Sequence, residues 1–153
     1  MRMRRWLLAS AAVVGVTGGV IALLIWTNPA PRVPSIPVVD PARARAPYVV
    51  KLHARWCPVC MVTKDQWANV QAAYDGEVRF VVFDFTTGAT TETSRAEARR
   101  LGLDAVFEDY VGETGTVLVV DGTTNAIRNS LHGNLELTEY RSAIDAALQA
   151  ATE

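Results

Sequence analysis

The stretch KLHARWCPVC, residues 51–60, contains the only two cysteines of the 153-residue chain. Cys57 and Cys60 are separated by two residues, with Trp56 before the first of them and Pro58 directly after it. The residues PYVVKLHA, which include the start of this stretch, are apolar and β-branched and predict a buried strand. Apolar residues at helical spacing over 58–74 then predict a helix. The cysteine pair is therefore expected where a strand ends and a helix begins.

A cysteine at the start of a helix is electrostatically favoured as a thiolate. The helix N-terminus presents unpaired N–H groups and a positive partial charge. Thiols in such places have pKa values lowered from about 8.5 to between about 3.5 and 7.5. Cys60 lies one helical turn after Cys57 and can close a small ring with it, so the pair can cycle between dithiol and disulfide. Pro58 suits the first helical position, where its missing N–H costs nothing.

Two other interpretations of the pair stay open. An inert structural disulfide would form in an oxidising compartment, although a bridge closing so short a loop constrains the unfolded chain little. The two thiolates and His53 could instead ligate zinc or copper, but a closed zinc site needs four ligands. His53 is expected to be a structural histidine, and His132 to be exposed. Because Met61 follows Cys60, the C-x-x-C-H haem pattern is absent. A C-x-x-C pair beside a strand–helix pattern is a signature of redox activity.

The rest of the body alternates strands and helices. A second strand is expected over 78–85, whose apolar middle is typical of a central strand covered on both faces. A threonine-rich loop follows, and Ser94 with Glu97 forms a capping-box pattern that begins a helix ending at Gly102. The segments TVLVVDG and AIRNSLH predict a hairpin, and Thr138 is expected to cap a last helix. The order β-α-β-α-β-β-α predicts an α/β fold with a central mixed sheet between two layers of helices.

The motif WCPVC at a strand-to-helix junction, within this order of elements, resembles the thioredoxin superfamily. The resemblance covers roughly residues 47–150 and implies a thioredoxin-like three-layer α/β/α sandwich. It also implies that Cys57 is the attacking, more exposed cysteine, that Cys60 is the buried resolving cysteine, and that Trp56 packs beside them. In the implied mechanism the Cys57 thiolate attacks a partner's disulfide, and Cys60 then releases the reduced partner. No cofactor is expected besides the redox-active Cys57–Cys60 disulfide.

Two positions depart from the pattern of that family. The family usually has a cis-proline that faces the cysteines, and this chain has Gly115 there, between Thr114 and Thr116. A cis bond before a non-proline residue costs about 2.5–4 kcal/mol, so a trans bond is expected. The family also often has a buried acid six residues before the first cysteine, where this chain has Lys51. A cation there favours a thiolate, but Lys51 and Arg55 are expected to reach solvent, because such side chains are rarely buried.

The segment DAVFEDYVGE, residues 104–113, leads toward Gly115 and is expected to be a solvated surface loop. It contains four acidic residues: Asp104, Glu108, Asp109 and Glu113. An alternative hypothesis is that these residues form an acidic rim that selects a basic partner.

The N-terminal part differs from the body in charge and hydropathy. Residues 1–47 carry six arginines against one acid, a net +5, whereas residues 48–153 carry nine basic against fifteen acidic residues, a net −6. The acidic body argues against nucleic-acid binding. Residues 6–26 are 21 uncharged residues with a tryptophan at each end, which predicts a transmembrane signal-anchor helix. A cleaved signal peptide is the alternative, although its apolar core would be shorter.

These features predict how the chain is organised around a membrane. Residues 1–5 are a basic end that the positive-inside rule places in the cytoplasm. Residues 27–46 form a proline-rich, semi-rigid linker, and residues 47–153 form the thioredoxin-like domain. The expected location is the bacterial cytoplasmic (inner) membrane, crossed once, with the domain on the extracytoplasmic, periplasmic side.

The sequence as a whole predicts a membrane-tethered thiol–disulfide oxidoreductase that uses Cys57 and Cys60. Its expected partners are extracytoplasmic protein thiols and disulfides, together with a second redox protein that recycles the pair. The alternatives are a thiolate metal-binding protein and a redox-inactive docking module built on the same fold.

Overall fold

The computed structural model describes residues 44–152. The predicted basic end, the transmembrane helix over 6–26 and nearly all of the linker over 27–46 lie outside the described residues. Within the part of the chain that is described, no helix is long and apolar enough to cross a membrane.

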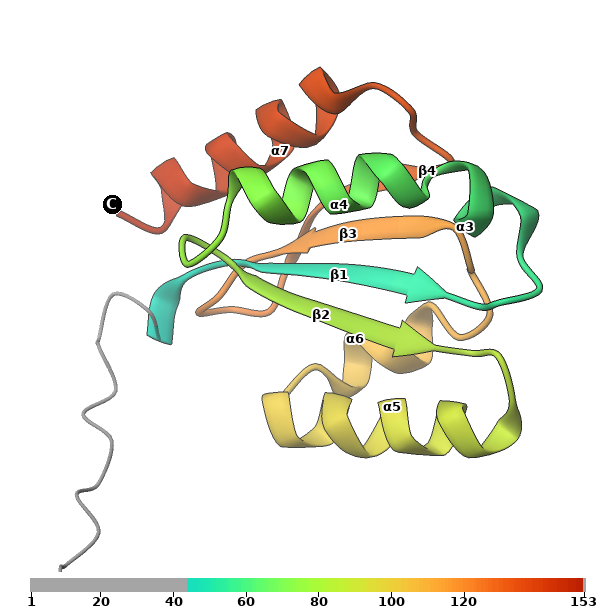
Figure 1. The fold of residues 1–153 in the computed structure, drawn as a ribbon. Coiled ribbons are helices and arrows are strands. Elements are labelled where there is room, and N and C mark those ends of the chain that lie inside the picture. Colours follow the sequence, from blue (N-terminus) through green and yellow to red (C-terminus); the bar gives the residue numbers. More distant parts are fainter. Residues whose placement is uncertain (1–43, 153) are drawn as a thin grey trace, which may run out of the picture. The chain divides into compact units, whose positions relative to one another are not determined.

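Four strands form one mixed sheet (Figure 1), as the sequence predicts. The strands are β1 (Tyr48–His53), β2 (Arg79–Asp84), β3 (Thr116–Val120) and β4 (Ile127–His132), in the spatial order β2-β1-β3-β4. Strand β1 pairs with β2 in parallel and with β3 antiparallel, and β3 and β4 form the predicted antiparallel hairpin. The central strands β1 and β3 are almost completely buried.

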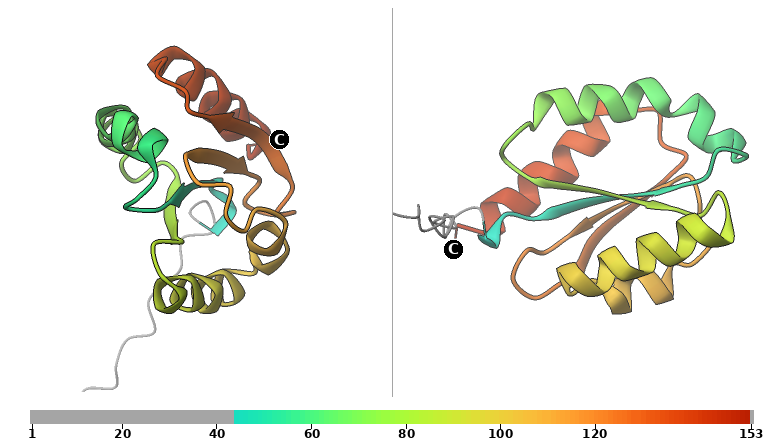
Figure 2. Two further views of the ribbon diagram at one scale, coloured as in Figure 1. Left: turned by 90° about the vertical axis from the view of Figure 1, so that its right-hand side faces the viewer. Right: turned by 60° about the horizontal axis from the view of Figure 1, so that its bottom comes forward.

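Helices cover both faces of the sheet, which gives the predicted three layers. Helices α4 (Lys64–Ala73) and α7 (Leu137–Ala150) lie on one face, and α5 (Gly88–Leu101) and α6 (Asp104–Asp109) lie on the other (Figures 1 and 2). Side chains alternate across β1, so Val49 enters the core under α4 and α7 whereas Val50 and Leu52 enter the opposite core. A short helix, α3 (Pro58–Val62), precedes α4 and begins just beyond the end of β1.

Helix α5 begins earlier than the sequence predicts. Thr87 is its N-cap. The Thr87 hydroxyl oxygen accepts a hydrogen bond from the Thr90 N–H, and the Thr90 hydroxyl oxygen accepts one from the Thr87 N–H, which makes a reciprocal capping box. The threonine-rich stretch is therefore the first part of the helix rather than a loop. Ser94 lies inside the helix, is buried, and accepts a hydrogen bond from the Asp84 N–H at 2.8 Å. The predicted end is confirmed, since Gly102 adopts a left-handed conformation with φ 73°.

The segment that was expected to be a surface loop before β3 contains helix α6. Val106 and Phe107 are buried in the core beneath the sheet, so this part of the chain is anchored by apolar contacts. Phe107 packs edge-on against Phe83 of β2 with ring centroids 5.1 Å apart. Of the acidic residues proposed as a rim, Glu108 is paired with Arg95 of α5 at 2.8 Å.

Two other helix boundaries differ from the prediction. The helix expected over 58–74 is interrupted at Thr63, whose hydroxyl donates to the Val59 carbonyl oxygen at 2.8 Å. Helix α7 begins at Leu137 with Glu136 as its N-cap, and this cap lies before Thr138, where the sequence predicts it. Neither difference moves the start of α3, which is the boundary that positions the cysteines.

Candidate active site

The cysteine pair lies where β1 leads into α3, as the sequence predicts. Cys57 is the N-cap of α3 and has an extended backbone, with φ −81° and ψ 114°. Its sulfur accepts a hydrogen bond from the Cys60 N–H at 3.2 Å, and Pro58 occupies the start of the helix. Both cysteines are free thiols. The local sequence therefore places one sulfur on the unpaired N–H groups of a helix end.

Both thiols are buried, which differs from the expected contrast between an exposed Cys57 and a buried Cys60. Cys57 is 3% exposed and Cys60 is 2% exposed, and they pack with Ala54 and Val59. The backbone at Gly115 comes so near that a Cβ built there would lie 3.6 Å from the Cys57 sulfur. The segment that leads into β3 therefore covers the pair more closely than the motif alone indicates.

The pKa values of the two thiols move in opposite directions. Burial alone would raise the pKa of Cys57, but hydrogen bonds from the Cys60 thiol, the Thr114 hydroxyl and the backbone N–H groups of Cys60 and Val59 outweigh it, and the pKa is lowered. Burial raises the pKa of Cys60, and its hydrogen bond to Cys57 acts in the same direction. Of the two thiols, Cys57 is therefore the one whose ionisation the site favours, and Cys60 is the one whose ionisation it disfavours.

Thr114 and Gly115 are both brought to the cysteines by the segment before β3. Gly115 has φ +88°, and a Cβ there would lie only 2.6 Å from Val59 Cγ1. Its N–H donates to the Leu52 carbonyl at 2.8 Å, and its own carbonyl accepts from the Gly133 N–H at 3.0 Å. The described residues contain no cis peptide bond, which agrees with the expected trans bond. Glycine is thus required here by backbone conformation and by close packing.

Lys51 is buried, contrary to the expectation that it reaches solvent. It is 6% exposed, and its Nζ lies 5.2 Å from the centroid of the Trp67 ring on α4. The reason is that β1 is a central strand with a helix over each face, so its alternating side chains have no route to the surface. Burial lowers the pKa of Lys51, whereas the nearby sulfurs of Cys60 and Cys57 raise it. Arg55, beyond the end of the strand, is exposed as expected.

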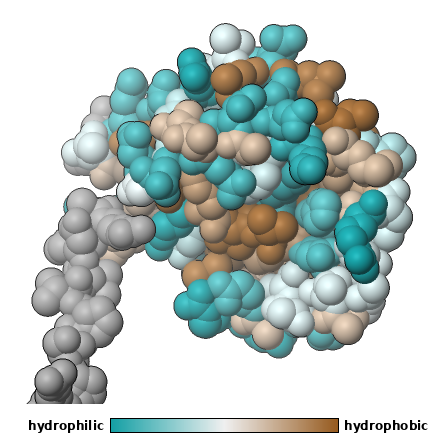
Figure 3. All heavy atoms as spheres, viewed as in Figure 1, coloured by the Kyte–Doolittle hydropathy of each residue, from teal (hydrophilic) through white to brown (hydrophobic). Residues whose placement is uncertain are grey.

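Trp56 does not belong to the buried cluster around the cysteines. Its side chain is 60% exposed, and its ring N–H donates to the Thr86 carbonyl at 3.2 Å. Met61 and Val62 on α3 are also well exposed, and Figure 3 shows a hydrophobic area over this helix and another along β2. The surface next to the cysteine pair is therefore apolar.

His53 ends β1 with its ring half-buried, and its Nδ1 atom is buried without a hydrogen-bond partner in the described structure. Burial lowers the pKa of this histidine. Over residues 44–152, no three side chains of His, Cys, Asp or Glu gather so that they could hold a metal ion. Cys57, Cys60 and His53 therefore do not form the ligand set that the metal interpretation requires. His132 is exposed, as expected, and its Nδ1 lies 2.9 Å from the Thr116 hydroxyl.

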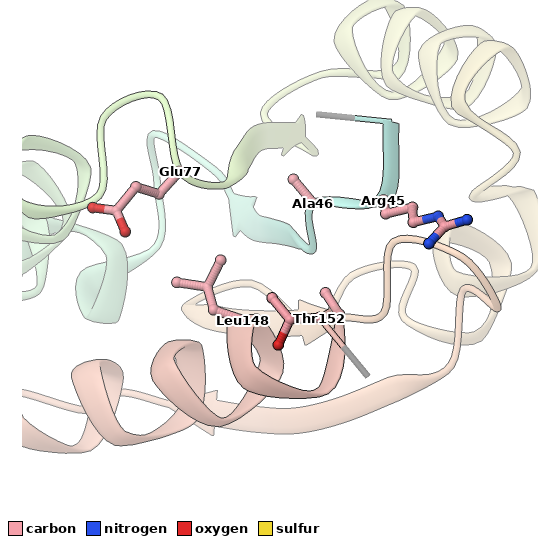
Figure 4. A pocket seen from close by; sticks show the side chains of 6 residues that line it. Arg45, Ala46, Glu77, Leu148 and Thr152 are labelled. Atoms are coloured by element: carbon pink, nitrogen blue, oxygen red, sulfur yellow. The ribbon is translucent and has the colours of Figure 1, made fainter. Parts of the chain in front are cut away.

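A pocket of about 280 Å³ lies at the opposite end of β1 from the cysteines (Figure 4). Its lining comes from the residues before β1, the turn before β2 and the end of α7: Arg45, Ala46, Glu77, Leu148, Ala151 and Thr152. The two cysteines follow the other end of the strand, so this pocket is separate from the candidate active site.

Comparison with known proteins gives similarity at the level of structure. No family model and no curated protein matches the chain. Trxlp from Edwardsiella tarda EIB202 is 16% identical, with a TM-score of 0.46 over 67% of this chain and 85% of that chain. MTB DsbF, solved in mixed oxidized and reduced forms, is 18% identical, with a TM-score of 0.47 over 67% of this chain and 81% of that chain. A malarial protein is 14% identical, with a TM-score of 0.45 over 67% of this chain and 98% of that chain.

The chain's own topology defines the fold. A parallel β1–β2 pair, an antiparallel β3–β4 hairpin on the other side of β1, and helices on both faces form one mixed sheet domain. A C-x-x-C pair at the junction of β1 and α3 completes the pattern. The chain has a thioredoxin-like fold with its cysteine pair in the position that the sequence predicts.

Proposed function

We propose that this protein is a membrane-tethered thiol–disulfide oxidoreductase that exchanges disulfides with proteins outside the cytoplasm. The observation that carries the proposal is the pairing of Cys57 and Cys60 at the start of α3. One sulfur accepts hydrogen bonds that favour its thiolate, while the other is a buried thiol within the same small cluster. An inert structural disulfide does not need two thiols with opposite pKa shifts. A redox pair with one attacking and one resolving cysteine depends on them.

The reaction has two exchange steps. The Cys57 thiolate attacks one sulfur of a partner disulfide, so that a new S–S bond forms to Cys57 and the partner's other sulfur leaves as a thiolate that takes a proton from water. Cys60, after losing its proton to water, attacks the Cys57 sulfur and releases the second partner sulfur. The Cys57–Cys60 pair is oxidised by two electrons and the partner is reduced by two. The reverse sequence oxidises a partner dithiol.

The burial of Cys57 requires that docking uncovers its sulfur. Thr114 donates to that sulfur and Val59 packs against it, so these are the side chains that a partner has to displace. Trp56, Met61 and Val62 are exposed beside them and offer apolar contact area for the partner. Apolar contacts of this kind are compatible with partners that expose hydrophobic segments around a cysteine.

The membrane location is proposed from the sequence. Residues 6–26 are long enough to span the hydrocarbon core, and the arginines before them favour a cytoplasmic N-terminus. In a bacterial host, protease added to spheroplasts should remove the domain while a cytoplasmic marker stays intact, and alkaline extraction should leave the full chain in the membrane. Recovery of the chain in the cytoplasmic fraction, or protection from the protease, would contradict this placement.

The activity is tested with the full chain, reduced and free of metal. Its exchange with a model protein disulfide at neutral pH should be much faster than that of a free thiol such as glutathione. The Cys57→Ser variant should lose this acceleration, and Cys60→Ser should accumulate a mixed disulfide with the model protein. Exchange no faster than glutathione would contradict the proposed function.

A further inference from the structure

The loop between β2 and α5, residues 85–87, contacts the turn that precedes Cys57. The Arg55 N–H donates to the Thr86 hydroxyl oxygen at 3.0 Å, and the Trp56 ring N–H donates to the Thr86 carbonyl oxygen at 3.2 Å. Both donors belong to the two residues that come just before Cys57, the N-cap of α3. A single residue of the loop therefore contacts both the backbone and the aromatic ring that lead into the candidate nucleophile.

Thr86 is itself fixed by the end of β2. Its N–H donates to the carboxylate oxygen Oδ1 of Asp84 at 2.7 Å, and hydrogen bonds to a carboxylate are roughly twice as strong as those between neutral groups. The Asp84 N–H donates to the Ser94 hydroxyl oxygen of α5 at 2.8 Å. Phe85, between them, is buried and stacks on the Phe107 ring. The loop is therefore anchored to β2, α5 and the core, and it can support the turn before α3.

Packing encloses only part of the Trp56 side chain. The residue is 60% exposed and lies outside the buried cluster around the cysteines. An exposed ring that changes rotamer freely has to be immobilised when a partner docks, which costs conformational entropy. The hydrogen bond from the ring N–H to the Thr86 carbonyl oxygen orients the ring before docking, so part of that cost has already been met in the free protein.

The Trp56 ring is within reach of any protein that forms a mixed disulfide with Cys57. Two cysteines joined by a disulfide have Cα atoms about 4.4–6.8 Å apart, and adjacent residues such as Trp56 and Cys57 have Cα atoms about 3.8 Å apart. The residues on either side of a partner's cysteine therefore come close to the exposed ring. A small disulfide reagent has no such residues, so its reaction depends on the Cys57 sulfur and much less on the ring.

We propose that Asp84 and Thr86 are positioning residues that orient Trp56 for the docking of partner proteins. This inference rests on the proposed function and adds to it a specificity element outside the cysteine motif. The Asp84 carboxylate fixes Thr86, and Thr86 fixes the turn and the ring of Trp56. The ring then contacts the partner chain beside its reacting cysteine. Loss of this support slows exchange with a protein disulfide more than it slows reaction with a small disulfide.

Two disulfide substrates separate docking from thiol chemistry. The reduced full chain reacts in single turnovers with a model protein disulfide and, in parallel, with dithionitrobenzoate, a small disulfide. Asp84→Ala should lower the second-order rate constant with the protein disulfide about two- to tenfold, which corresponds to the cost of immobilising one side chain on docking. Its rate constant with dithionitrobenzoate should stay close to that of the wild type. Asp84→Asn keeps an acceptor oxygen for the Thr86 N–H and should restore most of the rate with the protein disulfide.

A double-mutant cycle tests whether Asp84 acts through the ring. Trp56→Phe keeps an aromatic ring but has no N–H to donate to the Thr86 carbonyl oxygen. In that background Asp84→Ala should slow the exchange with the protein disulfide little further, so the effects of the two changes should not add. Thr86→Val removes the acceptor of the Arg55 N–H and should slow the same reaction. It replaces Asp84→Ala if circular dichroism shows that Asp84→Ala does not fold.

Thr93→Val is the matched control, because the Thr93 hydroxyl donates to the Ala89 carbonyl oxygen within α5 at 3.0 Å. This variant should exchange with both substrates as the wild type does. Three results would overturn the role of Asp84 and Thr86: an unchanged rate with the protein disulfide, equal slowing with both substrates, or additive effects in the cycle. A wild-type chain that reacts with the protein disulfide no faster than glutathione would contradict the proposed function itself.

Discussion

At Gly115 the chain brings backbone, and not a side chain, against the cysteine pair. Two independent factors disfavour a side chain at this position: the left-handed φ of +88°, and the 2.6 Å distance from a built Cβ to Val59 Cγ1. Gly115→Ala should therefore lower the free energy of unfolding by about 2 kcal/mol or more, from about 1–2 kcal/mol of backbone strain and about 1–3 kcal/mol of overpacking. Urea denaturation of the reduced chain measures this loss.

Gly112 separates the two causes, because its φ is +85° and a Cβ there would meet nothing within 4 Å. Gly112→Ala should lose only the backbone component, about 1–2 kcal/mol. In addition, Val59→Ala should recover part of the loss in Gly115→Ala by making room for the new methyl group. Equal losses at the two glycines would show that the contact with Val59 is unimportant.

Thr114 is expected to tune the nucleophile. Its hydroxyl is among the donors that lower the pKa of Cys57, so Thr114→Val should raise that pKa. The rate of alkylation at Cys57 rises with pH as the thiol ionises, so its midpoint should move to higher pH in the variant. Thr116→Val is the control, since that hydroxyl contacts His132 and not a sulfur. If the midpoint in Thr114→Val equals that of the wild type, Thr114 does not affect the pKa of Cys57.

At the residue scale, the sequence predicts that the two cysteines and Pro58 lie at the start of a helix, and that the peptide bond before Gly115 is trans. Each of these follows from local chain chemistry. It does not predict the burial of Lys51 or of the Cys57 sulfur. A lysine is usually exposed, and only the position of β1 in the middle of the sheet, with α4 over it, encloses this one. Likewise, Cys57 is covered by a segment about sixty positions further along the chain, which no local pattern reveals.

Helix α5 depends on a cap formed by threonines. Thr87 accepts from the Thr90 N–H at 3.1 Å, and the Thr90 hydroxyl lies 3.0 Å from the Thr87 N–H that donates to it. Thr87→Ala should lower the free energy of unfolding by about 1 kcal/mol. Thr93→Ala, within the same helix and exposed, should change it by less than about 0.5 kcal/mol. Indistinguishable results for the two variants in urea denaturation would contradict the cap.

At the element scale, strands were easier to predict than helix boundaries. The apolar runs of β1, β2 and β3 fit buried strands, and all three are found within one or two positions of the prediction. The predicted start of α5 was wrong because a Thr–Thr capping box is less distinctive in a sequence than the Ser94–Glu97 pattern. Helix α6 was missed because it is only six residues long and is stabilised by the burial of Val106 and Phe107 rather than by its own sequence periodicity.

Over the whole domain, stability is expected to be highest at the two central strands. Strands β1 and β3 have a hydrogen-bonded neighbour on each side and bury nearly all of their side chains, whereas β2 and β4 lie at the ends of the sheet order. Amide hydrogen exchange should therefore be slowest over Val49–Leu52 and Val117–Val120. Faster exchange in β1 than in β2 would show that the sheet is not the most stable unit of the domain.

The central claim is that Cys57 and Cys60 form one redox couple. The most direct measurement equilibrates the full chain with glutathione buffers of graded poise, blocks free thiols with an alkylating reagent, and determines each species by mass. The account predicts a single two-electron transition from the dithiol to a Cys57–Cys60 disulfide within one chain, whose midpoint gives the direction of electron flow. Cysteines that stay free at every poise, or that form only glutathione adducts or bonds between chains, would contradict it.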